Sequence, residues 1–216
     1  MVSNDYHPRK ADSVNILHID TSILGEVSAS RILSRAVVDQ LTSQTPTATV
    51  TYRDLAAHPL PHLSGAYLAG QTPGVKHDRA LQDDLDLGGR ALDEFLSADI
   101  VVIGVAFYNF GIPSQLKAWI DRITVAGKTF RYTDKGPEGL AGDKRIILAI
   151  ARGGFYGPDS GRQAYEHAES YLRVLFGFLG IGNIDVIAAE GMKVSAEQRE
   201  RSISAALKQI ELNVAA

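Results

Sequence analysis

The chain has 216 residues, 45% of them hydrophobic, which suits one domain with a single core. Its 22 basic and 25 acidic residues give a formal net charge of −3, which argues against binding to nucleic acid or to an anionic membrane surface. It contains no cysteine, so disulfides, thiolate metal sites and a cysteine nucleophile are excluded.

Residues 1–13 are polar and lack the apolar run of a signal peptide, so we expect a flexible N-terminal tail. No apolar run of about 18 residues occurs anywhere, so the sequence predicts no membrane-spanning helix. We therefore expect a cytoplasmic protein with one domain over residues 14–216.

The first elements alternate between strand and helix. Residues 14–19 are apolar and rich in β-branched side chains, which predicts a strand, and apolar residues then recur at helical spacing from 29 to 41. Residues 48–53 alternate threonine with larger side chains, which predicts an edge strand with one face in water.

The middle of the chain begins with a long irregular stretch. Residues 57–74 contain three prolines and three glycines and are predicted to be a loop, of a length that often borders a site. Residues 78–97 predict a helix that Gly88-Gly89 bends or frays. Residues 100–105 are apolar on both faces, which predicts a central strand, and a helix follows from Pro113 to about residue 125.

The last third continues the alternation. Residues 129–140 predict a small hairpin, and residues 145–151 predict a second strand with two apolar faces. A helix is predicted from about 161 to 178, and its nearly continuous apolar end indicates burial by more than one layer. Residues 184–189 predict the last strand, and a capping box at Ser195-x-x-Gln198 opens the final helix.

Five predicted strands thus alternate with five predicted helices. Such alternation indicates right-handed crossovers and a parallel sheet covered on both faces. The wet second strand and the apolar first, third and fourth strands fit the order 2-1-3-4-5. The predicted fold class is α/β, a flavodoxin-like three-layer sandwich.

In such a sheet, ligands bind beyond the carboxyl ends of the strands, beside strands one and three. The loop after strand one contains neither a dinucleotide-binding fingerprint nor a P-loop, but it places Ser22, Ser28 and Ser30 around the start of a helix. Hydroxyls and free helix amides can hold an anion such as the phosphate of FMN. The alternative is that Ser28 is only an N-cap.

The loops after the third and fourth strands suit a planar ring. Phe107, Tyr108, Asn109 and Phe110 offer flat apolar walls with polar groups, although aromatic residues at a strand end can also be core. The glycines in the run 152–154 allow backbone amides to approach a ligand, although turn chemistry alone also explains them.

Several ordered blocks carry a family resemblance. They are DTSIL at 20–24, SAS at 28–30, FYNF at 107–110, QLK at 115–117, TFRYT at 129–133, GPEGL at 136–140, RGG at 152–154 and GFLGI at 177–181. Together they resemble the FMN-dependent NADH-azoreductases, also described as quinone reductases. The resemblance runs from about residue 14 to the end of the chain.

The resemblance implies tightly bound, non-covalent FMN in a homodimer in which the partner subunit completes each flavin site. It assigns the FMN phosphate to Ser22, Ser28, Ala29 and Ser30. It assigns the ribityl chain and the ring to Phe107, Tyr108 and Asn109, and the polar edge of the ring to Ala151, Arg152, Gly153 and Gly154. It surrounds the acceptor pocket with aromatic residues, namely Phe110, Tyr132, Phe155 and Phe178.

The resemblance also implies a ping-pong transfer of two electrons from NADH or NADPH to a quinone or azo compound. The chemistry takes place on flavin N5, so no catalytic side chain and no metal are expected. The sequence departs from the family pattern at Ala106, where proline is usual, at Phe107, where methionine is usual, and at Ala151, where serine is common.

The sequence leaves three other functions to consider, and its residues disfavour two of them. A flavodoxin-type electron carrier usually has a strongly acidic docking face, which a net charge of −3 disfavours. An FMN-binding protein without acceptor-reductase activity stays open. A phosphoacceptor receiver domain needs an aspartate at the end of strand three, where Ala106 and Phe107 stand instead.

Overall fold

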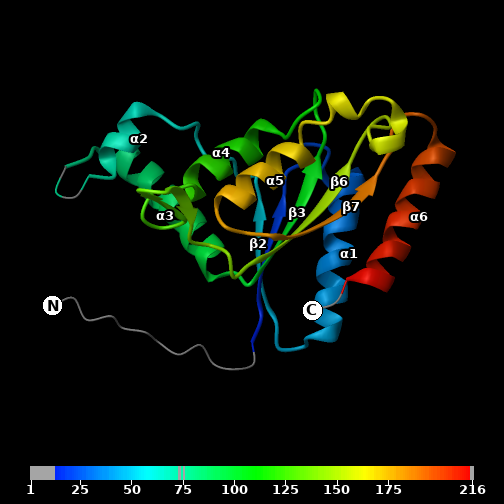
Figure 1. Cartoon of the computed structure of the whole chain (residues 1–216), viewed down its shortest axis with the longest axis horizontal. Coiled ribbons are helices and arrows are strands. Elements are labelled where there is room, and N and C mark those ends of the chain that lie inside the picture. The colour runs from blue at the N-terminus through cyan, green and yellow to red at the C-terminus, as the bar shows by residue number, and fades with distance from the viewer. Residues whose placement is uncertain (1–12, 73, 75, 215–216) are drawn as a thin grey trace.

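The computed structural model describes residues 13–72, 74 and 76–214, and its centre is a five-stranded parallel sheet (Figure 1). The strands lie in the order β2-β1-β3-β6-β7, which is the predicted order when these strands alone are counted. Their bounds are β1 Asn15–Asp20, β2 Thr49–Asp54, β3 Ile100–Ala106, β6 Arg145–Ala151 and β7 Asn183–Ala189. Apart from Ser13, the predicted tail lies outside the described residues.

Helices cover both faces of this sheet, so the three-layer sandwich is confirmed (Figure 1). One face carries α1 (Ala29–Gln44) and α6 (Ala196–Asn213). The other carries α3 (Arg79–Ser97), α4 (Ser114–Ile123) and α5 (Glu169–Phe178). Among the described helices, none is long and apolar enough to span a bilayer.

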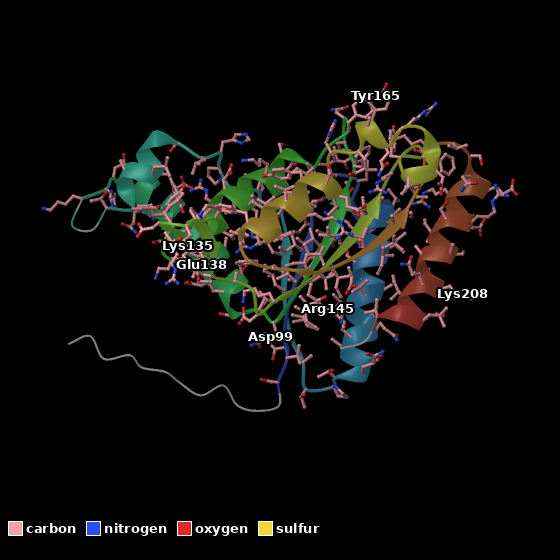
Figure 2. The ribbon with its side chains drawn as sticks, viewed as in Figure 1. Asp99, Lys135, Glu138, Arg145, Tyr165 and Lys208 are labelled. Atoms are coloured by element: carbon pink, nitrogen blue, oxygen red, sulfur yellow. The ribbon has the colours of Figure 1, made fainter. Side chains whose placement is uncertain are left out.

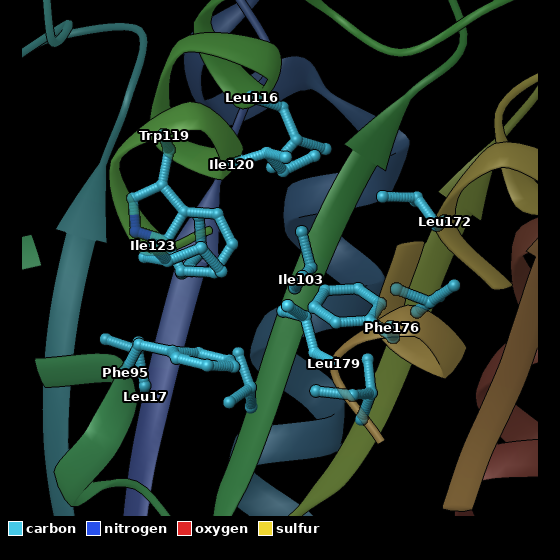
Figure 3. Close-up of a cluster of buried hydrophobic side chains, with 14 of the residues drawn as sticks. Leu17, Phe95, Ile103, Leu116, Trp119, Ile120, Ile123, Leu172, Phe176 and Leu179 are labelled. Atoms are coloured by element: carbon cyan, nitrogen blue, oxygen red, sulfur yellow. The ribbon is translucent and has the colours of Figure 1, made fainter. Parts of the chain in front are cut away.

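The larger core lies between the sheet and α3, α4 and α5 (Figure 3). Every residue of β3 is buried, as expected of a central strand with two apolar faces. Trp119 of α4 and Phe95 of α3 are fully buried and meet edge to face, with ring centroids 5.8 Å apart. This packing fixes α3 and α4 against the sheet.

The direction of the strands gives the molecule two different ends. Figure 2 shows Asp99 and Arg145 near the amino ends of β3 and β6, and Tyr165 at the opposite, carboxyl end. Pairing in register places Asp20 of β1 beside Asp54 of β2 and Gly104 of β3. Among the loops that leave the sheet at this carboxyl end, those after β1, β3 and β6 are the ones in which a ligand site is predicted.

The predicted hairpin is present as β4 (Phe130–Thr133) and β5 (Gly136–Gly139), which pair antiparallel. Its base packs backbone to backbone on the chain after α5. A Cβ built on Gly139 would lie 2.0 Å from the Gly180 nitrogen, so a residue without a side chain is required there.

The long loop between β2 and α3 differs from its prediction, because it contains a short helix, α2 (Gly65–Gly70). The Ser64 side chain caps this helix by accepting the Tyr67 amide. The prediction that Gly88-Gly89 frays α3 is wrong, since this helix runs unbroken from Arg79 to Ser97. Tyr67 is buried, and a Cβ built on Gly88 would lie 2.1 Å from its hydroxyl, so Gly88 makes room for α2.

The helix predicted from residue 161 begins only at Glu169. Gly161 has a φ of +67°, which ends a short 3-10 turn (Pro158–Ser160), and a second such turn, Gln163–Tyr165, follows. The Glu166 carboxylate then accepts three backbone amides at the start of α5, from residues 168, 169 and 170. This acidic cap sets the helix start later than its apolar pattern indicates.

Two predictions about exposure need correction. Both faces of β2 are open at residues 49–52, although alternation predicts only one wet face. The apolar end of α5 is not buried on all sides, since Leu172 and Phe176 are buried but Val174 is 74% exposed. The final capping box is confirmed in one half, because Ser195 Oγ accepts the Gln198 amide while the Gln198 side chain bonds Ser202.

Candidate functional site

A cavity of about 540 Å³ opens at the carboxyl ends of β1, β3 and β6. Every residue predicted to contact the cofactor lines it, except Arg152 and Gly154. The described lining residues are Ser22, Ile23, Leu24, Val27, Ser28, Ala29, Ser30, Ala106, Phe107, Tyr108, Asn109, Phe110, Ala151, Gly153, Tyr156, Met192, Lys193 and Arg199. The volume suits a ligand of cofactor size.

One end of the cavity is formed by hydroxyl groups at the start of α1. Ser22, Ser28 and Ser30 are almost completely buried. Ser28 occupies the N-cap position, yet its side chain makes no capping hydrogen bond and lies 3.0 Å from Ser30 Oγ. The N-cap interpretation therefore does not account for the Ser28 hydroxyl, and the two serines lie beside helix amides, an arrangement that favours an anion.

Tyr108 connects the loop after β3 to the loop after β1. Its hydroxyl lies 3.2 Å from Ser22 Oγ and accepts the Ile23 amide at 3.3 Å. Ser22 Oγ in turn accepts the Leu24 amide. These bonds hold two walls of the cavity at a fixed separation.

The loop after β3 turns through two adjacent non-glycine residues in the left-handed region, Asn109 (φ +48°) and Phe110 (φ +70°). This conformation is costly for a residue with a Cβ, particularly a bulky one. Hydrogen bonds between Tyr108 and Gly111 close the turn, and the Phe110 carbonyl accepts the His167 amide at 2.9 Å. The turn places Asn109 and Phe110 in the cavity lining.

Beneath the serines lies a buried polar cluster around Asp20. The Asp20 carboxylate accepts hydrogen bonds from Ser34 Oγ at 2.8 Å and from the Tyr52 hydroxyl at 3.0 Å, and His18 Nε2 lies 3.6 Å away. Burial raises the pKa of Asp20, but the hydrogen bond and charge of His18 and the two hydroxyls together lower it by more, so that the pKa lies below its usual value. Burial and the Asp20 charge raise the pKa of Tyr52 to about 12.

Arg31 connects this cluster to the cavity loop. Its guanidinium donates two hydrogen bonds to the Asp54 carboxylate, at 2.7 and 2.9 Å, and two to the Ser22 carbonyl, at 2.8 and 3.3 Å. Burial raises the pKa of Asp54, but the bond from Arg31 and two backbone amides lower it on balance. Arg31 therefore anchors the loop that carries Ser22.

Of residues 151–154, which are predicted to contact the polar edge of the flavin ring, only some line the cavity. Ala151 and Gly153 line the cavity, and the Lys193 stem lies 3.5 Å from a Cβ built on Gly153. The Arg152 side chain is buried elsewhere, where it pairs with the carboxylates of Glu166, Glu169 and Glu190. A Cβ built on Gly154 would lie 3.3 Å from the Tyr156 ring.

The four residues predicted for the acceptor pocket lie in separate places within one chain. Phe110 lines the cavity, and the exposed Phe155 ring lies beside Gly191. Tyr132 and Phe178 both contact Phe130, at ring distances of 5.4 and 4.7 Å, and neither lines the cavity. A single chain therefore does not assemble the predicted pocket.

Sequence reasoning missed several lining residues. Tyr156 packs its ring 4.9 Å from Phe107, and Met192, Lys193 and Arg199 arrive from the segment after β7. The Arg199 guanidinium donates to the Val27 carbonyl at 2.6 Å across 172 residues of sequence. The signal that could have revealed Met192 and Lys193 is their place just after a parallel strand, whose carboxyl end faces the same edge.

Comparison with known proteins agrees with this architecture. Residues 14–214 match the family model described as flavodoxin-like fold. Among curated relatives, the FMN-dependent NADH:quinone oxidoreductase of Methylorubrum populi is 56% identical over 194 residues, which cover 90% of this chain and 96% of the relative. That of Xanthomonas campestris pv. campestris is 54% identical over 200 residues, with 92% and 98% covered.

Solved structures agree as well. Azoreductase from Bacillus anthracis str. Sterne matches with a TM-score of 0.79 and 32% identity, over 92% of this chain and 97% of that chain. An FMN-dependent NADH-azoreductase from Bacillus anthracis str. Ames Ancestor, in complex with FMN, matches with a TM-score of 0.82 and 27% identity, over 92% and 96%. The chain belongs to the flavodoxin-like fold family, and within it to the FMN-dependent NADH:quinone oxidoreductases.

Proposed function

We propose that this protein is an FMN-dependent oxidoreductase that transfers two electrons from NADH or NADPH to quinones, azo compounds or both. The observation that carries the proposal is the cavity at the strand ends, which collects the predicted cofactor residues in one place. The names of the relatives and of the FMN complex support the same activity. The family match over residues 14–214 supports one domain, and use of NADH suits a cytoplasmic location.

The lining of the cavity fits FMN. Ser28, Ser30 and the free amides of α1 supply hydrogen-bond donors for a phosphate without a P-loop. Phe107 and Tyr156 supply flat apolar surface for a ring system. Gly153 lines the cavity without a side chain, so its backbone can come close to the polar edge of the ring.

When bound, FMN supplies the redox chemistry, and the protein supplies binding, orientation and exclusion of water. Tyr108, Ser22 and Arg31 keep the phosphate loop in place through the hydrogen bonds described above. Phe110 and Tyr156, with ring centroids 6.2 Å apart, form an apolar rim at the open side. Donor and acceptor both need this side, so we propose that they occupy it in turn, with ping-pong kinetics.

We propose that a second copy of the chain completes the acceptor pocket. An apolar groove of about 660 Å³ runs from the cavity loop along α5, lined by Gly111, Ile112, Lys117, His167, Ser170, Tyr171 and Val174. Val174, which lines this groove, and the hairpin residue Tyr132 are 74% and 76% exposed. A partner that covers this groove would bury Val174 and would explain why one chain leaves the predicted pocket divided.

A spectroscopic experiment tests the proposed activity. Apoprotein titrated with FMN should bind it with a change in the visible spectrum, lose the flavin absorbance when NADH is added without oxygen, and regain it when a quinone is added. Protein that binds FMN but is not reduced by NADH would support an electron carrier instead. Protein that does not bind FMN would refute the proposal.

The dimer is tested by charge insertion. Val174→Glu should convert a dimer to a monomer in sedimentation velocity and abolish quinone reduction, because a carboxylate cannot be buried in an apolar interface without a partner. Leu212→Glu, on the opposite layer and 73% exposed, is the matched control and should do neither. A wild-type protein that sediments as a monomer at all concentrations would contradict the proposal.

A further inference from the structure

The charge of the cavity differs from that of the chain. The protein carries more acidic than basic residues, yet the described lining of the cavity includes two cationic side chains, Lys193 and Arg199, and no Asp or Glu. Both cations come from the segment that follows β7 and opens α6. A water-accessible cavity of one sign attracts an anionic ligand.

The two cations lie at different ends of the cavity. The Lys193 stem lies beside Gly153, after β6. Arg199 lies at the other end, where its NH2 group donates to the Val27 carbonyl at 2.6 Å. Val27 directly precedes Ser28, so Arg199 is held beside the serine hydroxyls and the first amides of α1.

Arg31 is closer in sequence to these serines, but its guanidinium is already engaged. Asp54, the Ser22 carbonyl and the Tyr52 hydroxyl take its hydrogen bonds. By contrast, the Arg199 guanidinium donates one hydrogen bond among the described residues, and its acceptor is the Val27 carbonyl. A guanidinium carries five N–H donors, so most of those on Arg199 stay available to a ligand.

We propose that Arg199 is the counter-charge for the phosphate of the bound flavin, and that it makes the site selective for FMN over riboflavin. The inference rests on the proposed function, because it assigns the serine end of the cavity to the phosphate. Serine hydroxyls and helix amides hold the phosphate oxygens, and Arg199 neutralises part of their charge from the neighbouring helix α6. The selectivity follows because riboflavin has the same ring and ribityl chain without the phosphate.

The test compares two flavins on two variants. Arg199→Gln removes the cation and keeps a polar side chain of similar length. Arg201→Gln is the matched control, since it removes the same charge from the same helix at an exposed residue that pairs with Glu197 and does not line the cavity. Dissociation constants of FMN and riboflavin for each apoprotein are measured by flavin fluorescence, and inorganic phosphate is titrated as a competitor of FMN.

We expect Arg199→Gln to weaken FMN binding by about 5- to 30-fold, the range for one partly exposed hydrogen bond to a charged group. Riboflavin binding should change by less than about twofold, and the inhibition constant of phosphate should rise in parallel with the dissociation constant of FMN. Arg201→Gln should leave all three values within about twofold of wild type. Added salt should reduce the preference for FMN in wild type more than in Arg199→Gln.

Two results would overturn the inference. Equal weakening of FMN and riboflavin by Arg199→Gln would show that Arg199 only holds the Val27 loop in place. Unchanged FMN and phosphate binding would show that the guanidinium does not reach the phosphate. A wild-type protein that binds neither flavin would instead refute the proposed function, so the two failures are distinguishable.

Discussion

Asp20 is the charged group whose removal tests the polar cluster beneath the cavity. Its side chain is 5% exposed and lies at the end of β1, where it accepts hydrogen bonds from Ser34 and Tyr52. We consider Asp20→Asn, which keeps the shape of the side chain but removes its charge and replaces one acceptor oxygen with an NH2 donor.

The expected cost follows from the hydrogen bond that the amide cannot accept. The amide oxygen can still accept one of the two hydroxyls, so about one hydrogen bond to a charged group disappears, which contributes about 1.5–3 kcal/mol. Arg31 NH1, 3.7 Å from the carboxylate, also loses part of its counter-charge but keeps Asp54. We therefore expect the free energy of unfolding to fall by about 2–3 kcal/mol at pH 7.

The cost should depend on pH with a definite sign. Because the folded protein holds the pKa of Asp20 below its ordinary value of 3.8, the carboxylate stabilises the fold above about pH 4. This stabilisation is lost as the pH falls through the lower, folded-state pKa. The difference between wild type and Asp20→Asn should accordingly shrink below about pH 4.

The assay is urea unfolding of the apoprotein, followed by circular dichroism from pH 7 to pH 3. Asp93→Asn, at an exposed position of α3, is the matched control and should change stability by less than about 0.5 kcal/mol. A loss under about 0.5 kcal/mol for Asp20→Asn, or a loss that stays constant down to pH 3, would refute the reasoning.

Three further predictions concern the hairpin and the cavity. Gly139→Ala should destabilise the protein by more than about 3 kcal/mol in thermal unfolding, because the new Cβ meets the Gly180 backbone at 2.0 Å, whereas Gly65→Ala, in open space, should change stability little. Tyr132→Ala should change quinone and azo kinetics more than the dissociation constant of FMN, because Tyr132 lines no part of the cavity, and a larger effect on FMN would contradict this placement. Ser28→Asp should leave the fold intact, because aspartate is also favoured at an N-cap position, yet it should prevent FMN retention, since it places a carboxylate at the phosphate end. Full flavin content in the folded variant would contradict the assignment.

The order of strands in the sheet could be predicted from the sequence because the strands differ in how far their side chains are buried. The two-faced apolar run of β3 is incompatible with an edge, and the polar run of β2 is incompatible with the centre, so their places follow from composition. The short helix α2 was missed because interactions with residues distant in sequence stabilise it. Tyr67 lies on Gly88 and under the Arg122 guanidinium, whose central carbon is 3.6 Å from the ring centre.

The candidate site was predictable wherever a residue directly follows a strand. Ser22, Phe107 and Gly153 belong to loops that parallel strands bring to one edge, whatever the details of packing. Arg199 lies within a helix rather than directly after a strand, and the packing of α6 against α1 brings it beside Val27. The division of Tyr132 from the cavity was also hidden, because a family pattern does not state how far apart its residues lie in one folded chain.

The left-handed backbone at Asn109 and Phe110 lowers the stability of the fold as long as these two side chains are kept. A conformation of this kind costs about 1–3 kcal/mol for a residue with a Cβ, and glycine relieves most of that cost. Random mutation to glycine at either position would thus be favoured by folding alone. Under selection for stability without selection for activity, this turn should be among the first segments to drift, and the cavity would lose an amide and an aromatic ring while the sheet beneath it stayed intact.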